Sequence, residues 1–260
     1  MKINVRFTSD QRLIMPDKRT HRGPHPQDAK LFAPAVVADL RSAVADFSLL
    51  LTKGYAEKSA LKLVGDKFSF TERQRLAVMR SACSDRQITS RKQNEVKTET
   101  LAGQSLAIDG YNLLITIEAA MSSAVILKGR DGCLRDLASI HGTYRKVTET
   151  IPAVRLIGEF LQETGTMDCL WLLDSPVSNS GRLKTLIGQL AQKNNWLWEI
   201  KLLPSPDYEL IRTERIVATS DSAVLDRCKK WVNLARAVID AKLPQTRLID
   251  LSDSFMNRPG

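Results

Sequence analysis

The sequence has few of the residues that build disulfide frameworks and cysteine-rich metal sites. Its four cysteines, Cys83, Cys133, Cys169 and Cys228, are scattered along the chain without any CxxC pair. This spacing argues against a zinc site of the cysteine type and against a fold held by disulfides. It predicts buried free thiols in a reducing compartment.

Long apolar segments and a secretion signal are also missing. The most apolar stretch, residues 106–127, contains Asp109 and Glu118, which the core of a bilayer would penalise. The N-terminus begins with charged residues and lacks the apolar core of a signal peptide. We therefore expect a soluble, cytoplasmic protein that has no membrane partner.

Charge is present in quantity, and it is unevenly distributed. The 260 residues carry a formal net charge of +9, yet 43% of them are hydrophobic, as in an ordinary globular protein. Residues 1–100 contain 19 Lys and Arg against 11 Asp and Glu, whereas the remaining 160 contain 19 against 18. This asymmetry predicts that the N-terminal part contacts a polyanion such as nucleic acid. A basic surface that is merely solvated is the alternative.

The hydrophobic pattern divides the chain into two parts. Helical spacing predicts helices over 36–51 and 55–64, with stops at Gly54 and Gly65, and a capping box predicts a third over 72–83. Residues 85–104 are polar and charged. We therefore predict a basic helical domain over 1–95, a linker over 96–104 and an α/β domain over 105–260.

In the second part, short apolar runs alternate with amphipathic segments. This alternation predicts a mainly parallel sheet with helices on both faces, which binds its ligand at the carboxyl ends of the strands. The expected strands are 105–109, 169–174, 196–203, 215–219 and 246–251. The expected helices are 112–122, 131–142, 151–163, 183–193 and 222–241.

Aspartates stand where these strands end. Asp109, Asp174 and Asp221 follow apolar runs directly, and Asp207 lies in the loop after a fourth run. In a parallel sheet these four carboxylates converge on one edge. Carboxylate oxygens suit Mg²⁺ or Mn²⁺, which support the hydrolysis of phosphodiesters. The alternative is that each aspartate only caps the helix that follows it.

Four short motifs resemble those of the PIN/NYN group of ribonuclease domains. They are IDGYN, the strand end at Asp174, SPD and VATSD, in this order, and the resemblance covers about residues 105–250. It implies a PIN/NYN-like, Rossmann-like fold with metal ligands and catalytic residues at Asp109, Asp174, Asp207 and Asp221. It also implies that Asn112 positions the first carboxylate or a phosphate.

The chain departs from this family around Asp207. Pro206 stands where the family usually has alanine, and Tyr208 replaces an adjacent acid. Few residues separate Asp207 from the next strand, so any helix there is short. Asp207 is therefore the ligand that the resemblance supports least.

The whole chain also resembles the prokaryotic proteins of domain-of-unknown-function family 434. The segments HRGPHPQDAKLF, GYAEKSALKLVGDKFSFTERQRLAV and GRDGCLRDLASIHGTYR carry this resemblance. The family brings no established activity, and it implies only a cytoplasmic location and the two-part layout.

Two further stretches are candidates for binding phosphate. Arg130, Arg135 and Arg145 lie in and after a glycine-containing insertion, where arginines could clamp a nucleic-acid backbone. The alternative is that Arg130 and Arg135 pair with Asp131 and Asp136 on a helix surface.

The second stretch lies directly after Asp174. Ser178, Ser180 and Arg182 belong to a small-residue loop that opens a helix, and backbone N–H groups at such a place can bind an anion. An ordinary helix cap is the alternative.

Together these patterns predict a ribonuclease that depends on Mg²⁺ or Mn²⁺, with RNA as its partner. Two alternatives stay open: a non-catalytic protein that binds nucleic acid or regulates, and a magnesium-dependent phosphotransfer enzyme acting on a nucleotide. The sequence also leaves open RNA versus DNA and whether the chain forms homo-oligomers.

Overall fold

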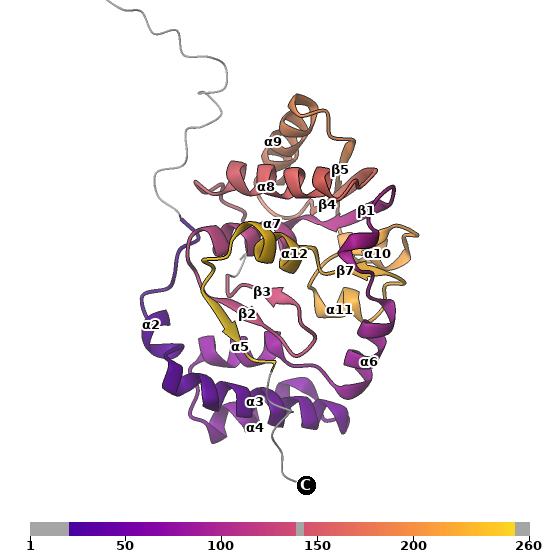
Figure 1. Ribbon diagram of the computed structural model, residues 1–260. Coiled ribbons are helices and arrows are strands. Elements are labelled where there is room, and N and C mark those ends of the chain that lie inside the picture. Colours follow the sequence, from indigo (N-terminus) through magenta and orange to yellow (C-terminus); the bar gives the residue numbers. More distant parts are fainter. Residues whose placement is uncertain (1–20, 139–142, 253–260) are drawn as a thin grey trace, which may run out of the picture.

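The computed structural model describes residues 21–138 and 143–252 and shows a mixed α/β protein built on a five-stranded sheet (Figure 1). All five strands run parallel in the order β5-β4-β1-β6-β7, so the first strand is central. The mainly parallel sheet predicted from the sequence is therefore confirmed. The strands are β1 (Ser105–Asp109), β4 (Asp168–Asp174), β5 (Trp198–Leu203), β6 (Ile216–Ala218) and β7 (Trp231–Val232).

Helices cover both faces of this sheet, because its inner strands are apolar on both sides. Leu106 and Ile108 of β1 pack in one cluster with α7, α8, α9 and α12, whereas Ala107 packs in another with α10 and α11. Such double coverage is what a parallel sheet requires. The helices are α7 (Gly110–Met121), α8 (Thr150–Glu163), α9 (Ser180–Lys193), α10 (Pro206–Arg212), α11 (Ser222–Leu225) and α12 (Leu234–Lys242).

A second, smaller sheet lies between this body and the N-terminal helices (Figure 1). Its middle strand, β2 (Ile126–Lys128), pairs antiparallel with β3 (Leu134–Arg135) and parallel with β8 (Leu248–Asp250). The elements before the large sheet are α2 (Asp28–Leu31), α3 (Pro34–Thr52), α4 (Glu57–Lys67), α5 (Glu72–Ser81), α6 (Asp85–Asn94) and a 3-10 turn, η1 (Thr98–Thr100).

The N-terminal helices share an apolar core with the small sheet. Val125, Leu127, Leu137 and Leu251 belong to the same buried cluster as Phe47 and its neighbours on α3, α4 and α5. This cluster joins the two sides of the boundary predicted at 96–104. The division into two domains stays a prediction, and the packing shows that the two parts are closely joined.

The N-terminal part differs from the expected pattern at two places. The stop predicted at Gly65 is wrong, because α4 continues to Lys67. Gly65 is instead a point of close approach, since a Cβ there would clash with the guanidinium group of Arg75. Helix α6 was not expected within the polar stretch, although Ser84 and Gln87 form a capping box at its start.

The C-terminal part differs at two expected helices. Residues 131–138 of the helix expected over 131–142 form turns and the short β3, and residues 139–142 lie outside the described chain. The helix expected over 222–241 is broken into α11, β7 and α12. The break occurs because Trp231 is fully buried and its indole N–H donates to the Arg91 carbonyl oxygen at 2.8 Å. This contact holds the segment extended at the edge of the sheet.

Two expectations about what the chain lacks can be compared with residues 21–138 and 143–252. All four cysteines are buried and unpaired, as predicted. In the same part of the chain, no helix has both the length and the apolar character needed to cross a membrane.

The shared core predicts a large effect of truncating Leu127. Leu127→Ala should lower the free energy of unfolding by about 2–5 kcal/mol, because it removes a fully buried side chain between the small sheet and the N-terminal helices. Leu248→Ala, on the exposed side of neighbouring β8, should have a much smaller effect. Urea unfolding of both variants measures the difference, and equal losses would contradict the shared core.

Candidate functional site

Asp109 stands at the carboxyl end of the central strand. It is the last residue of β1, and α7 begins at the next residue, Gly110. A Cβ at Gly110 would lie 2.8 Å from the Leu172 carbonyl oxygen and 2.6 Å from Cδ2 of Leu173. Glycine therefore allows β1 and β4 to approach closely at the point where the chain turns into α7.

The loop after β6 is bonded to the start of α7. The Thr219 hydroxyl donates to Oδ2 of Asp109 at 2.7 Å. Oδ1 of Asn112 accepts from the Ser220 N–H at 2.9 Å and from the Ser220 hydroxyl at 2.7 Å. The IDGYN and VATSDS motifs therefore meet, and Asn112 holds the loop of Ser220. Its role toward the Asp109 carboxylate or a phosphate stays a prediction.

Asp221 follows this loop and caps α11. Its Oδ1 accepts from the N–H groups of Ala223 at 2.8 Å and Val224 at 3.0 Å. The capping role that the sequence left as an alternative is thus present at this aspartate. Asp221 also lines a cavity with Asp109, so its side chain serves the helix and faces the same space.

The other two aspartates belong to α10 and β4. Asp207 lies in the first turn of α10, a helix of only seven residues, and is exposed at the cavity. Asp174 is the last residue of β4 and is partly buried. It does not line the cavity, but its charge acts on Asp109 and on Tyr111.

Burial and mutual repulsion raise the pKa values of three of these aspartates. Burial is the largest cause at Asp109, where it acts with the charges of Asp221, Asp207 and Asp174 against the hydrogen bond from Thr219, and the pKa reaches about 7. The pKa values of Asp174 and Asp207 are also raised, first by the partial loss of solvent around each carboxyl group and then by a neighbouring carboxylate of the set. The four carboxylates therefore act on one another electrostatically.

A cavity of about 480 Å³ opens at this edge. One wall is the edge of the sheet, and the opposite wall comes from the N-terminal helices through Glu57, Met79 and Arg80. Its volume lies within the range of small-molecule sites. The sequence did not indicate these wall residues, because the contact between distant helices and the strand ends forms only in the folded chain.

Tyr111 is a further polar group at the cavity that the sequence did not single out. Its side chain is 5% exposed and its hydroxyl has no hydrogen-bond partner within the described chain. Burial, together with the charge of Asp174, raises its pKa to about 12. A buried donor without a partner is costly, so a bound oxygen ligand would stabilise this arrangement. The sequence feature that could have identified Tyr111 was its position inside the IDGYN motif.

The donor chemistry of this edge suits a hard divalent cation. Carboxylate oxygens dominate it, and a cation would relieve the repulsion that adds to burial in raising the pKa of Asp109. Within residues 21–138 and 143–252, however, no three His, Cys, Asp or Glu side chains already lie in an arrangement that could hold a metal ion. The aspartates are ligands of the type that a hard divalent cation prefers. To coordinate such a cation, their side chains would have to turn toward a common point.

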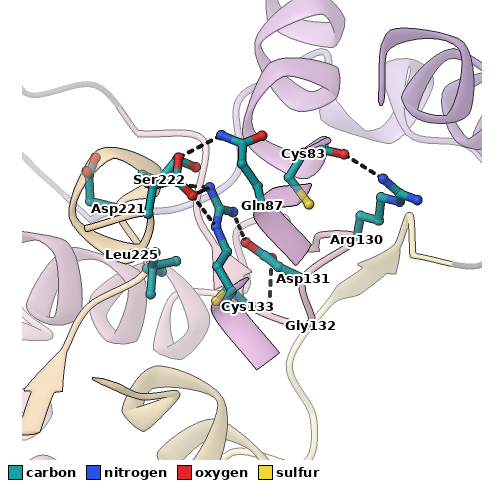
Figure 2. A network of polar contacts seen from close by, with 12 residues as sticks. Cys83, Gln87, Arg130, Asp131, Gly132, Cys133, Asp221, Ser222 and Leu225 are labelled. Atoms are coloured by element: carbon teal, nitrogen blue, oxygen red, sulfur yellow. Dashed lines mark hydrogen bonds and ion pairs between the residues drawn. The ribbon is translucent and has the colours of Figure 1, made fainter. Parts of the chain in front are cut away.

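The predicted arginine clamp is engaged by the protein itself. Arg130 donates to the Cys83 carbonyl oxygen at 2.7 Å, as Figure 2 shows, and to Asp85 at 2.5 Å. Arg135 donates two hydrogen bonds to Asp131, at 2.9 and 2.7 Å. The pairing differs from the helix-surface alternative, because these residues lie in a β-hairpin. A role in binding phosphate stays a prediction for both arginines.

Asp131 is the centre of a buried ion cluster near Asp221 (Figure 2). Besides Arg135, it binds Nη1 of Arg91 at 2.5 Å, and Arg91 also pairs with Asp226 at 2.7 Å. Burial raises the pKa of Asp131, but Arg135 and Arg91 outweigh it and the pKa is lowered. Arg135 also donates to the carbonyl of the residue before Asp221, at 2.7 Å, so the cluster fixes the loop of the acidic edge.

The remaining predicted binding residues lie beside Asp174. The Tyr144 N–H donates to the Ser178 carbonyl oxygen at 3.1 Å, which brings the segment of Arg145 next to the start of α9. Arg145, Ser178 and Arg182 are exposed, whereas Ser180 is buried. Among the described residues, none caps the first turn of α9 with its side chain. This arrangement leaves anion binding there as a prediction.

The raised pKa of Asp109 predicts a pH dependence of stability in the metal-free protein. The folded state holds the Asp109 proton up to about pH 7, whereas an unfolded chain releases it near pH 4, so stability should fall as pH rises through this window. Asp109→Asn cannot ionise, and at pH 8 it should exceed wild type in stability by at least about 1 kcal/mol.

Urea unfolding with chelator at pH 5 and pH 8 measures this effect. Asp240→Asn, on the exposed side of α12, is the matched control and should keep the pH dependence of wild type. If Asp109→Asn keeps it as well, Asp109 is not the group that titrates.

Two family models match successive stretches of this chain. The family described as "Protein of unknown function (DUF434)" matches residues 39–94, so the resemblance stated for the whole chain is confined to that region. A protein of Methanocaldococcus jannaschii, "Uncharacterized protein MJ0935", is 30% identical over 203 residues, which cover 77% of this chain and 97% of that protein. No solved structure matches the chain. The family described as "Domain of unknown function (DUF5616)" matches residues 98–237, more than half of the chain, and the protein therefore belongs to the DUF5616 family.

Proposed function

We propose that this protein is a divalent-metal-dependent nuclease that hydrolyses RNA phosphodiester bonds. The observation that carries the proposal is the acidic edge: four aspartates from β1, β4, α10 and the loop after β6 act on one another beside one cavity. Clustered carboxylates destabilise a fold unless something positive binds them. A bound cation that supports phosphodiester hydrolysis would explain the clustered aspartates. It also agrees with the order of the motifs that resemble the PIN/NYN group.

The proposed fold of residues 105–260 is PIN/NYN-like. The resemblance of IDGYN, the Asp174 strand end, SPD and VATSD supports this assignment. The parallel sheet adds support, because its order puts the first motif on the central strand and the last on an adjacent strand.

Each residue at the edge has a defined part in this proposal. A divalent ion held by Asp109, Asp174, Asp207 and Asp221 would stabilise charge on the phosphate and lower the pKa of the attacking water. Thr219 orients the Asp109 carboxylate through its hydroxyl. The unpartnered Tyr111 hydroxyl would donate to a phosphate oxygen, since it is buried at the cavity wall.

The N-terminal helices would hold the nucleic acid through lysines instead of arginines. Four of their arginines are engaged in ion pairs with acids of the same chain: Arg73 with Asp28, Arg75 with Asp66, Arg80 with Asp136 and Arg91 with Asp131.

Near the cavity wall formed by Glu57, the lysines are exposed. Lys53 and Lys58 flank Tyr55, whose side chain is 57% exposed. This segment combines positive charge with an aromatic surface on which a base can stack.

The volume of the cavity supports a second candidate function, phosphotransfer to or from a nucleotide. The cavity is a defined space of about 480 Å³, and such a volume suits a single nucleotide as well as one residue of a strand. A magnesium-dependent phosphotransfer enzyme acting on a nucleotide would use the same aspartates. Turnover of free nucleotides without cleavage of RNA would favour this function.

The acidic edge predicts metal-dependent cleavage that depends on Asp109. Purified protein should cut RNA with Mn²⁺ or Mg²⁺ and stop with chelator. Asp109→Asn should lower the rate by a factor of at least about 100, because it removes a charged ligand and disturbs ion placement. Gel assays of labelled RNA measure the rate, and a metal-induced rise in melting temperature reports binding separately.

Asp240→Asn is the matched control, since it removes an exposed carboxylate far along the chain, and it should stay active. Equal cleavage by wild type and Asp109→Asn would expose a contaminating nuclease. No cleavage of any RNA, together with no shift in melting temperature, would replace this proposal with the non-catalytic alternative.

The lysine segment predicts a specific salt dependence of RNA binding. Replacing Lys53 and Lys58 by alanine should reduce the slope of log affinity against log salt by about 0.7 for each phosphate that a lysine no longer neutralises. Tyr55→Ala should weaken binding by about 1–3 kcal/mol and leave the slope unchanged, since stacking releases no counterions. Fluorescence titration of single-stranded RNA across a salt series separates the two effects. Lys229→Ala is the control, and an unchanged slope in the double variant would mean that the RNA binds elsewhere.

A further inference from the structure

Strand β5 is the outer strand of the large sheet, and its outer edge carries backbone groups that pair with no other described strand. Within residues 21–138 and 143–252, β5 pairs only with β4. The carbonyl oxygens of Leu197 and Leu203 accept from the N–H groups of β4 and the residue after it. Along a strand, the backbone N–H and C=O groups of successive residues point alternately to its two edges. The N–H and C=O groups of Ile200 and Leu202, and the carbonyl of Trp198, therefore point away from β4.

Charged side chains are the one usual protection that the described residues give this edge, since Glu199 and Lys201 are exposed on it. Edge strands are also blunted by proline, by a bulge or by a covering segment. The segment WEIKLL contains no proline, and its pairing with β4 runs without a bulge over all six residues. Leu197, just before it, is 70% exposed, the largest exposure among the large hydrophobic residues described.

The side chains of this edge are complementary to themselves when the strand is reversed. On one face, Leu197, Glu199, Lys201 and Leu203 follow one another at every second position. Glu199 and Lys201 are exposed and pair with each other at 3.2 Å. An antiparallel copy centred on Ile200 puts each glutamate opposite a lysine and each of these leucines opposite a leucine.

The other face obeys the same symmetry. Trp198, Ile200 and Leu202 are partly buried against the core cluster under α9. In the same register, Ile200 meets Ile200 and Trp198 meets Leu202 of the second copy. Two bonds between the Ile200 residues and two from the Leu202 N–H groups to the Trp198 carbonyls would close the ladder.

We propose that β5 pairs antiparallel with β5 of a second copy of this chain, so that one continuous sheet crosses two protomers. Such a contact uses one surface patch on both subunits, which is the common form of a two-fold dimer. A parallel arrangement in register would oppose Glu199 to Glu199 and Lys201 to Lys201, and like charges directly opposite are destabilising. The proposal does not depend on the activity of the acidic edge.

A charge-swap cycle tests this contact in the full-length protein. Glu199→Lys and Lys201→Glu each turn both symmetric ion pairs into like-charge pairs, so each should raise the dimer dissociation constant by a factor of about ten or more. The double variant Glu199→Lys with Lys201→Glu re-forms the pairs in reverse and should restore the dimer. Asp39→Lys, on α3 at the other end of the molecule from β5, is the control and should dimerise like wild type (Figure 1).

Sedimentation velocity over a wide concentration range gives the dissociation constants, and circular dichroism checks that every variant is folded. A wild-type protein that stays monomeric at its highest soluble concentration overturns the proposal. A dimer that neither single swap weakens lies on another surface. Single swaps that weaken it without rescue in the double variant contradict the antiparallel register.

Discussion

The buried carboxylate of Asp131 is the constraint that ties the parts of this protein together. It lies in the β2–β3 hairpin and binds Arg91 of α6 on one side and Arg135 of β3 on the other. A buried charge is tolerated only when it is paired, and removal of one partner is strongly destabilising. Arg91 also forms an ion pair with Asp226, which follows α11, and Arg135 donates a hydrogen bond to the loop before Asp221. One ion cluster therefore positions the N-terminal helices, the small sheet and the acidic edge relative to one another.

At the acidic edge, the fold gathers charges that oppose one another. The protein offsets part of this repulsion, since Thr219 donates to Asp109 and Asp221 is engaged in capping α11. Burial first, and then the neighbouring carboxylates, still raise the pKa of Asp109. This repulsion, together with a Tyr111 hydroxyl that has no hydrogen-bond partner among the described residues, is the basis on which a bound cation and phosphate are proposed.

The N-terminal helices form one wall of the cavity, and several of their basic side chains are engaged in ion pairs within the protein. Arg80 lines the cavity while donating to the Asp136 carbonyl oxygen at 2.6 Å, and its neighbours on α5 hold other acids. The excess of basic residues counted from the sequence therefore overstates the charge open to a polyanion. Lys53 and Lys58, which are close in sequence to the cavity-lining Glu57, are exposed.

The sequence by itself determined the features that depend on local pattern. Apolar runs alternating with helices predicted the parallel sheet, and the capping box of α5 predicted where that helix begins. Asp109 at the end of β1 was found because a strand end is marked in the sequence. Only the tertiary structure decided the remainder: Gly65 lies inside α4 because Arg75 packs on it, and β7 interrupts an expected helix because Trp231 is buried. The partners of Arg135 were likewise decided by the tertiary structure. Such contacts join residues far apart in the chain, and their energies exceed the local preferences that a sequence pattern reports.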